Sequence, residues 1–124
     1  MLRLVHFSSA ALSGELSPGA FGTGCATRSD KRGLPKVFAF VEGSTLGGDA
    51  RLLGWRKCYR AVVDEATLYD LREADPLGWR ALGDREAADA KVLAEGYKGL
   101  RLLREDGAEI VCSFVSISLD KVAP

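Results

Sequence analysis

Ile110-Val-Cys-Ser-Phe-Val-Ser-Ile-Ser-Leu119 is the stretch that decides the fold class, because it is long, apolar and rich in strand-forming residues. The shorter apolar run Leu100–Leu103 precedes it, and the turn residues Glu105-Asp106-Gly107 separate the two. Apolar runs joined by such a turn predict two antiparallel strands. Alternation along Ile110–Leu119 predicts one face of Val111, Ser113, Val115, Ile117 and Leu119, and an opposite face of Ile110, Cys112, Phe114, Ser116 and Ser118.

Further strands are expected outward from this pair, at Leu2–Phe7, Val37–Val41, Cys58–Val63 and Leu68–Leu71. Phe38 and Phe40 should share one face of their strand, opposite Val37, Ala39 and Val41. The chain thus holds about five to six strands and one or two helices, without regular β-α-β alternation. This order predicts an α+β fold with a mainly antiparallel sheet and argues against a Rossmann-type domain.

Asp84–Glu95 is the clearest predicted helix. Asp84 suits its N-cap, the segment is rich in alanine, and Gly96 suits a left-handed C-terminal stop. We expect its buried stripe to contain Ala88, Val92 and Leu93, together with Ala81 or Leu82.

Composition describes one ordinary globular domain over residues 1–124, which is too short for two. Lys plus Arg equals Asp plus Glu, 17 against 17, so the whole chain has no basic excess that would attract nucleic acid. No apolar run approaches the roughly 18 residues that span a bilayer, and the N-terminus lacks the long apolar core of a secretory signal. We therefore expect a cytoplasmic protein with no membrane partner and no direct nucleic-acid binding.

Ser13–Gly33 is dense in glycine and should form an extended loop, which in so small a domain is more often functional than not. The three cysteines, Cys25, Cys58 and Cys112, are far apart and form no C-x-x-C pair. They suggest neither a zinc site nor a disulfide framework, and free cysteine is usually a small buried hydrophobe.

His6 and Glu109 are the candidate catalytic residues. His6 is the only histidine and stands at the end of the first strand, where a scaffold presents polar groups to a cleft, although a structural hydrogen bond would also explain it. Glu109 opens the last long strand directly after a turn, so it should lie at the sheet rim. A carboxylate there is either a solvated strand end or a group that stabilises an oxocarbenium-like sugar.

Other chemical motifs are missing or weak. Phe21-Gly22-Thr23-Gly24 is only a fragment of a nucleotide loop, being neither G-x-G-x-x-G after a strand nor a Walker loop. The sequence has no G-x-S-x-G elbow for a hydrolase, and no H-E-x-x-H or calcium-loop spacing. We expect no metal site.

A family resemblance joins these pieces in order. His6-Phe7-Ser8, Leu16–Gly24 and Val37–Val41 resemble the "HYS" strand, the "LDPxxYGTG" loop and the aromatic "YFYV" strand of a domain found in phage and mobile-element polyvalent proteins. The second half matches through Leu68–Leu71, Asp75–Gly78, the helix, Gly96-Tyr97-Lys98-Gly99 and the final strand led by glutamate. The resemblance spans nearly the whole chain.

That domain looks like a compact ADP-ribosyltransferase. The resemblance implies a split antiparallel sheet that holds NAD in a cleft, with His6 on a ribose hydroxyl and the nicotinamide side, and Glu109 on the ribosyl cation. It further implies that Phe7, Ser8, Thr23 and Gly24 line the cofactor site. Related transferases place a tyrosine after the glycine loop, where this chain has Cys25-Ala26-Thr27, so Phe38, Phe40 or Tyr59 is expected to stack on nicotinamide.

The implied function is a mono-ADP-ribosyltransferase that takes NAD as substrate and modifies a host protein, as a phage or mobile-element effector of which an anti-CRISPR-like inhibitor is one form. The second hypothesis is a non-catalytic fold of the same kind that binds a protein or NAD. The absent tyrosine favours this second hypothesis, whereas the joint presence of His6 and Glu109 favours the first. An NAD glycohydrolase would use the same residues with water as acceptor.

Overall fold

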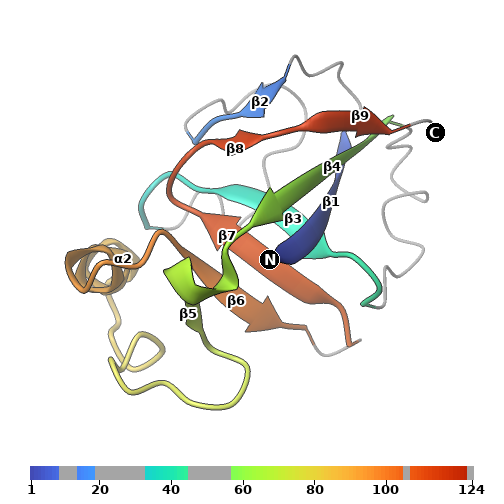
Figure 1. The fold of residues 1–124 in the computed structure, drawn as a ribbon. Helices are drawn as coiled ribbons and strands as arrows, with labels where there is room; N and C mark the ends of the chain where they lie inside the picture. The colour runs from blue at the N-terminus through green and yellow to red at the C-terminus, as the bar shows by residue number, and fades with distance from the viewer. Residues whose placement is uncertain (9–13, 19–32, 45–56, 105–106, 123–124) are drawn as a thin grey trace.

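The fold was analysed in a computed structural model, which describes residues 1–8, 14–18, 33–44, 57–104 and 107–122. Within these residues, seven strands form one sheet in the order β5-β6-β7-β3-β1-β4-β9 (Figure 1). Its strands are β1 (Leu2–Ser8), β3 (Val37–Val41), β4 (Lys57–Val63), β5 (Leu68–Asp70), β6 (Gly99–Leu103), β7 (Glu109–Ser113) and β9 (Asp120–Val122). A second, two-stranded sheet pairs β2 (Glu15–Leu16) with β8 (Ile117–Ser118).

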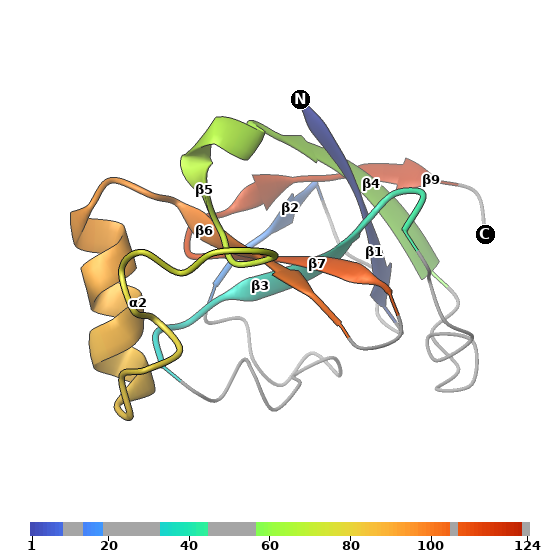
Figure 2. The same cartoon turned by 90° about the horizontal axis from the view of Figure 1, so that it is seen from below.

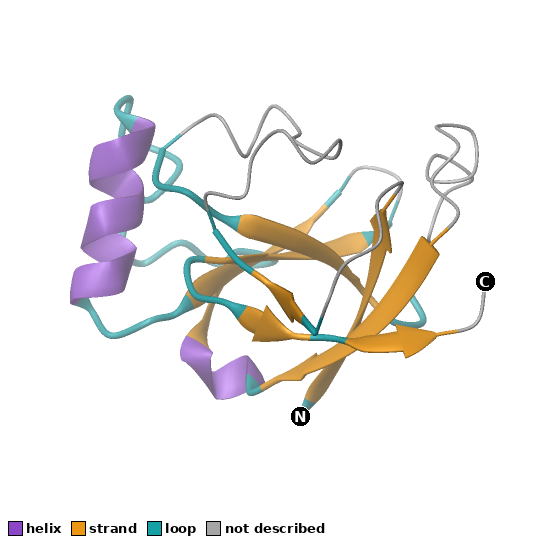
Figure 3. Ribbon diagram, turned by 90° about the horizontal axis from the view of Figure 1, so that it is seen from above, coloured by secondary structure: helices purple, strands orange, loops and turns teal. Residues whose placement is uncertain are grey.

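The predicted α+β class with a mainly antiparallel sheet is confirmed. Every neighbouring pair in the large sheet is antiparallel except β5 and β6, which run parallel. The described residues contain one α-helix, α2 (Arg85–Ala94), and a 3-10 turn, η2 (Glu65–Thr67). Figures 2 and 3 show α2 beside the β5–β6–β7–β3 part of the sheet, away from β1, β4 and β9. In the described part of the chain, no helix is long and apolar enough to cross a membrane.

The sheet has two apolar faces. The inner face, defined by Leu4, Ala39, Val41 and Val111, belongs to a core cluster that also contains residues of β4, β5 and the β8 region. The helix face, defined by Tyr69, Leu100 and Cys112, forms a second cluster with Val92 of α2 and with the partly buried Phe38. The predicted alternation along β3 is confirmed, since Val37, Ala39 and Val41 are buried while Phe38 and Phe40 are only partly so.

The sheet divides between β1 and β3. β1 pairs with β4 along its whole length, from Leu2 to Ser8, but with β3 only at Leu4 and Val5. β1 and β4 cross β3 and β7, as Figures 1 and 2 show. The split leaves the C-terminal half of β1, which carries His6, without a backbone ladder to β3.

The predicted single strand over Ile110–Leu119 is wrong, because the chain leaves the sheet after Ser113. The Ser113 hydroxyl donates to the Val115 carbonyl at 2.7 Å and accepts from the Val115 amide at 3.2 Å. Such local side-chain bonds compete with a strand ladder. Val115 is consequently exposed, whereas Ile117 and Leu119 still reach the inner-face core. Cys112 is a free buried thiol, as expected, while the side chains of Cys25 and Cys58 lie outside the described residues.

Helix α2 begins and ends as predicted. The Asp84 carboxylate accepts from the Glu86 and Ala87 amides, and Gly96 has a φ of 98°. Its predicted buried stripe is only partly correct: Ala88 and Val92 are buried, but Leu93 is 37% exposed. Of the two alternatives before the helix, Leu82 is partly buried and Ala81 is exposed.

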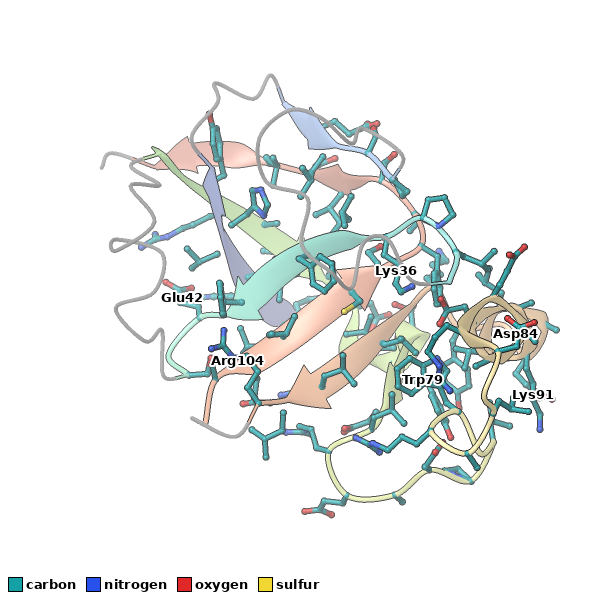
Figure 4. The ribbon with its side chains drawn as sticks, turned by 180° about the vertical axis from the view of Figure 1, so that it is seen from behind. Lys36, Glu42, Trp79, Asp84, Lys91 and Arg104 are labelled. Atoms are coloured by element: carbon teal, nitrogen blue, oxygen red, sulfur yellow. The ribbon has the colours of Figure 1, made fainter. Side chains whose placement is uncertain are left out.

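Asp89 of α2 is fully buried, although it was not among the residues expected in the buried stripe. Its Oδ2 accepts from Lys36 Nζ at 2.5 Å and from the Leu34 amide at 3.0 Å, and its Oδ1 accepts from Trp79 Nε1 at 2.8 Å. Lys36 and Trp79 lie beside the helix in Figure 4. A buried carboxylate is tolerated when it is paired and hydrogen-bonded in this way.

The glycine-rich stretch Ser13–Gly33 is not loop throughout. Strand β2 lies within it and pairs with β8, so Glu15 faces Ser118 and Leu16 faces Ile117. Residues 19–32, which include Thr23, Gly24 and Cys25, lie outside the described residues.

Candidate functional site

His6 stands where the sheet divides. It lies on the inner face of β1, directly across from Tyr59 of β4. Its ring Nδ1 lies 2.5 Å from the Phe38 carbonyl oxygen of β3. The imidazole thus makes the contact between the two strands beyond the point where their backbone ladder stops.

The partner of Nδ1 fixes the chemistry of the ring. A carbonyl oxygen can only accept a hydrogen bond, so Nδ1 carries the proton and, in the neutral ring, Nε2 is an acceptor. Burial lowers the pKa of His6 below its ordinary value, against a smaller upward effect of the bond to Phe38. The ring is therefore neutral near pH 7, with Nε2 able to accept a hydrogen bond from a hydroxyl group. Nε2 has no hydrogen-bond partner in the described part of the chain.

Glu109 opens β7 and is held by two arginines through a single oxygen. Oε1 accepts from Arg101 Nε at 3.1 Å and Nη2 at 2.9 Å, and from Arg72 Nη1 at 3.1 Å. Its side chain is 22% exposed. Among the described residues, Oε1 is thus anchored by three N–H groups and Oε2 accepts no hydrogen bond.

Each arginine is itself oriented by another carboxylate. Arg72 binds Asp70 through Nε and Nη2, and this pairing lowers the pKa of Asp70 to about 2. Arg101 Nη1 lies 3.3 Å from Glu65 Oε2. An open pocket of about 510 Å³ lies beside this network and is lined by Asp70, Arg72, Glu73, Ala74, Leu103 and Glu109.

His6 and Glu109 lie on the same face of the sheet but are not in contact. Their strands are separated by β3, and Glu109 is level with Leu4, two residues before His6 on β1. Strand spacing of about 4.8 Å and a rise of about 3.3 Å per residue place their Cα atoms on the order of 10 Å apart. The buried side chains of Ala39 and Val41 lie between them. A ligand that touched both would have to bridge this apolar stretch.

The aromatic candidates divide between the two faces. Tyr59 shares the inner face with His6 and is 2% exposed. Phe40 pairs with Val5, whose side chain points away from the face that carries Leu4 and His6. Phe40, and Phe38 two residues before it, therefore point to the opposite face. Tyr59 is thus the one of the three whose side chain lies on the same face as the histidine.

The other predicted cofactor residues are Phe7, Ser8, Thr23 and Gly24. Phe7 and Ser8 continue β1 and are level with Cys58 and Lys57, but their side chains are outside the described residues, as are Thr23 and Gly24 entirely. The described residues contain no group of three His, Cys, Asp or Glu side chains placed to hold a metal.

Sequence reasoning missed Arg72 and Arg101, the two partners of Glu109. Alternation along β6 could have placed Arg101 on the inner face, next to Val111 of the neighbouring strand. Arg72 lies in the turn after β5, and no local pattern shows that it reaches a residue 37 positions away.

Comparisons of the chain with protein-family models, with curated proteins and with solved structures found no match.

Proposed function

We propose that this protein is a mono-ADP-ribosyltransferase that uses NAD to modify a protein of the host cell. The observation that carries the proposal is the state of His6 at the division of the sheet. Its Nδ1 proton is committed to the Phe38 carbonyl, and burial keeps the ring neutral. Nε2 is thereby fixed as an acceptor for a hydroxyl donor such as that of a ribose.

Three further features support the same proposal. The division between β1 and β3 agrees with the split sheet that the family resemblance implies. Of the three aromatic candidates, Tyr59 alone lies on the face of His6, directly across from it on β4. Glu109 is on the same face and keeps one oxygen clear of hydrogen bonds to the described residues.

The reaction needs cation stabilisation more than acid–base chemistry. The bond between ribose C1′ and the pyridinium nitrogen breaks, and its electron pair leaves with nicotinamide, which becomes neutral. Glu109 stabilises the ribosyl cation through its available oxygen, and His6 fixes the ribose hydroxyl. A nucleophilic side chain of the acceptor protein then bonds to C1′ and loses its proton to solvent.

A second candidate, a non-catalytic domain that binds NAD or a protein, has its own supporting observation. Arg72 and Arg101 both neutralise Glu109, which weakens the field that this carboxylate can exert on a cation. The buried aliphatic side chains between His6 and Glu109 also favour this candidate.

The two candidates are separated by incubating the protein with NAD labelled on the adenylate part, together with host-cell lysate. Label on a protein band and free nicotinamide are expected for the transferase. Nicotinamide without protein label indicates a glycohydrolase, and binding without either product indicates the non-catalytic domain.

Four variants make the assay specific. Glu109→Gln should remove most of the label, whereas Glu86→Gln, an exposed position on α2, should retain it. His6→Asn keeps a donor near the place of Nδ1 but lacks the Nε2 acceptor, so it should lose activity. His6→Gln extends a polar group toward the place of Nε2 and should retain more. Full labelling by Glu109→Gln would contradict the assignment of this residue.

A further inference from the structure

The network around Glu109 is more than a pair of surface charges. Three N–H groups converge on Oε1, two of them from the Arg101 guanidinium. Arg101 is the most buried member, with 12% of its side chain exposed against 34% for Arg72. Glu109 therefore has its anchor on the sheet side, through a residue of the neighbouring strand.

The position of Arg101 is fixed independently of Glu109. It lies on β6 level with Val111, two residues beyond Glu109 on β7, so the two side chains meet on one face. Glu65 at η2 binds the far nitrogen, Nη1. The guanidinium plane is thus held from both ends, and its Nε and Nη2 edge faces Oε1.

When hydrogen bonds hold one oxygen of a carboxylate, few rotamers of the side chain remain. The position of the other oxygen is then restricted as well. Fixing a reacting group in this way lowers the activation barrier, because its freedom is lost before the substrate binds. A lysine cannot reproduce this hold, since its ammonium is a point charge without the planar pair of N–H groups.

We propose that Arg101 is the positioning residue of Glu109, which it holds through Oε1 so that Oε2 is presented to the ligand. This inference rests on the proposed transferase function. Arg72 has a secondary part, because it gives Oε1 one bond and spends its other nitrogens on Asp70.

The first test observes the contact itself, without any activity. The Arg101 Nε–H resonance, assigned by its loss in Arg101→Lys, should be protected from exchange with water in the parent protein. Glu109→Gln should shift this resonance, because a neutral amide oxygen accepts more weakly than a carboxylate. A resonance that Glu109→Gln leaves unmoved would overturn the proposal.

The second test separates positioning from folding and from binding. In Arg101→Gln, kcat for release of nicotinamide should fall about 100-fold, the loss typical of a misplaced reacting group, with KM for NAD little changed. Arg101→Lys should recover only part of that loss, and Arg60→Gln, which removes an exposed arginine paired with Glu42, should behave as the parent.

The outcomes distinguish this inference from the function on which it rests. A parent protein that neither cleaves NAD nor labels a protein overturns the transferase function, and the positioning role with it. An active parent whose kcat is unchanged by Arg101→Gln overturns only the positioning role. A loss that appears in KM, or an equal loss in Arg101→Lys and Arg101→Gln with a lowered melting temperature, assigns Arg101 to binding or to structure instead.

Discussion

Two ion-paired carboxylates of this small domain have opposite surroundings. Asp89 of α2 is fully buried, pairs with a lysine whose side chain is 4% exposed, and has hydrogen bonds on both oxygens. Glu109 of β7 is 22% exposed, pairs with two arginines beside an open pocket, and has described hydrogen bonds on one oxygen only. The first carboxylate has no remaining capacity for a ligand, and the second has.

The difference separates a structural group from a candidate functional one. Asp89 joins α2 to the Trp79 turn, ten positions earlier, and to the segment before β3, which is more than 50 positions away. All of its described hydrogen bonds are to groups of the protein itself. The bond from Glu109 to Arg101 joins neighbouring strands that already share a ladder, and the bond to Arg72 reaches the partly exposed turn after β5. These ion pairs therefore add little cohesion and serve to orient the Glu109 carboxylate. The comparison predicts large stability effects at Asp89 and small ones at Glu109.

Asp89→Ala should have the largest effect on the free energy of unfolding, because it removes the buried carboxylate that pairs with the Lys36 ammonium. Breaking a buried pair in this way costs about 3–5 kcal/mol. Urea unfolding of the parent and the variant measures it. Asp84→Ala, which removes the exposed N-cap of the same helix, should cost only about 1 kcal/mol.

The double variant Lys36→Met/Asp89→Leu tests whether the loss in Asp89→Ala comes from the charge of Lys36 that remains. This variant removes both buried charges of the pair, so stability should return to near that of the parent or exceed it. If Asp89→Ala unfolds no more easily than Asp84→Ala, the pair does not hold α2 to the sheet.

Gly33→Ala should have the next largest effect on the free energy of unfolding, because its added methyl group would collide with the Asp89 carboxylate. Gly33 has a φ of 80°, and a Cβ there would overlap Asp89 Oδ2. Gly43→Ala is the matched control, because Gly43 has a φ of 85° but nothing within 4 Å of its added Cβ. Backbone strain alone should cost each variant about 1 kcal/mol. A larger loss in Gly33→Ala, measured by urea unfolding, reports the contact with Asp89, and equal losses would contradict it.

Glu109→Gln should have the smallest effect on stability. Its ion pairs are partly exposed, and such pairs contribute about 0.2–1 kcal/mol. Thermal and urea unfolding should therefore place this variant close to the parent, while its activity on NAD falls. A stability loss as large as that of Asp89→Ala would show that Glu109 is a structural residue too.

Local features of the fold could be predicted from the sequence because their causes are local. The N-cap at Asp84, the stop at Gly96 and the alternation in Val37–Val41 depend only on neighbouring residues. The break after Ser113 could not be predicted from alternation, which continues through Val115, because a serine hydroxyl bond ends the strand.

The candidate site was less predictable because it depends on register and on distant partners. His6 could be placed at a strand end, but its bond to Phe38 needs the pairing of β1 with β3. That same register puts Phe38 on the face opposite His6 and Tyr59 on the same face. The burial of Asp89 likewise follows from Lys36, 53 positions away.

The single histidine offers the most direct test of the central claim, that His6 accepts a hydrogen bond from NAD through Nε2. Its two ring nitrogens give the only imidazole signals in a ¹⁵N spectrum of the protein, so no residue assignment is needed, and coupling of Nε2 to the Cδ2 proton distinguishes the two nitrogens. At pH 7 we expect the neutral tautomer with the proton on Nδ1, and addition of NAD should shift the Nε2 resonance while Nδ1 stays protonated. A proton on Nε2 in the free protein, or an Nε2 resonance unchanged by saturating NAD, would contradict the account.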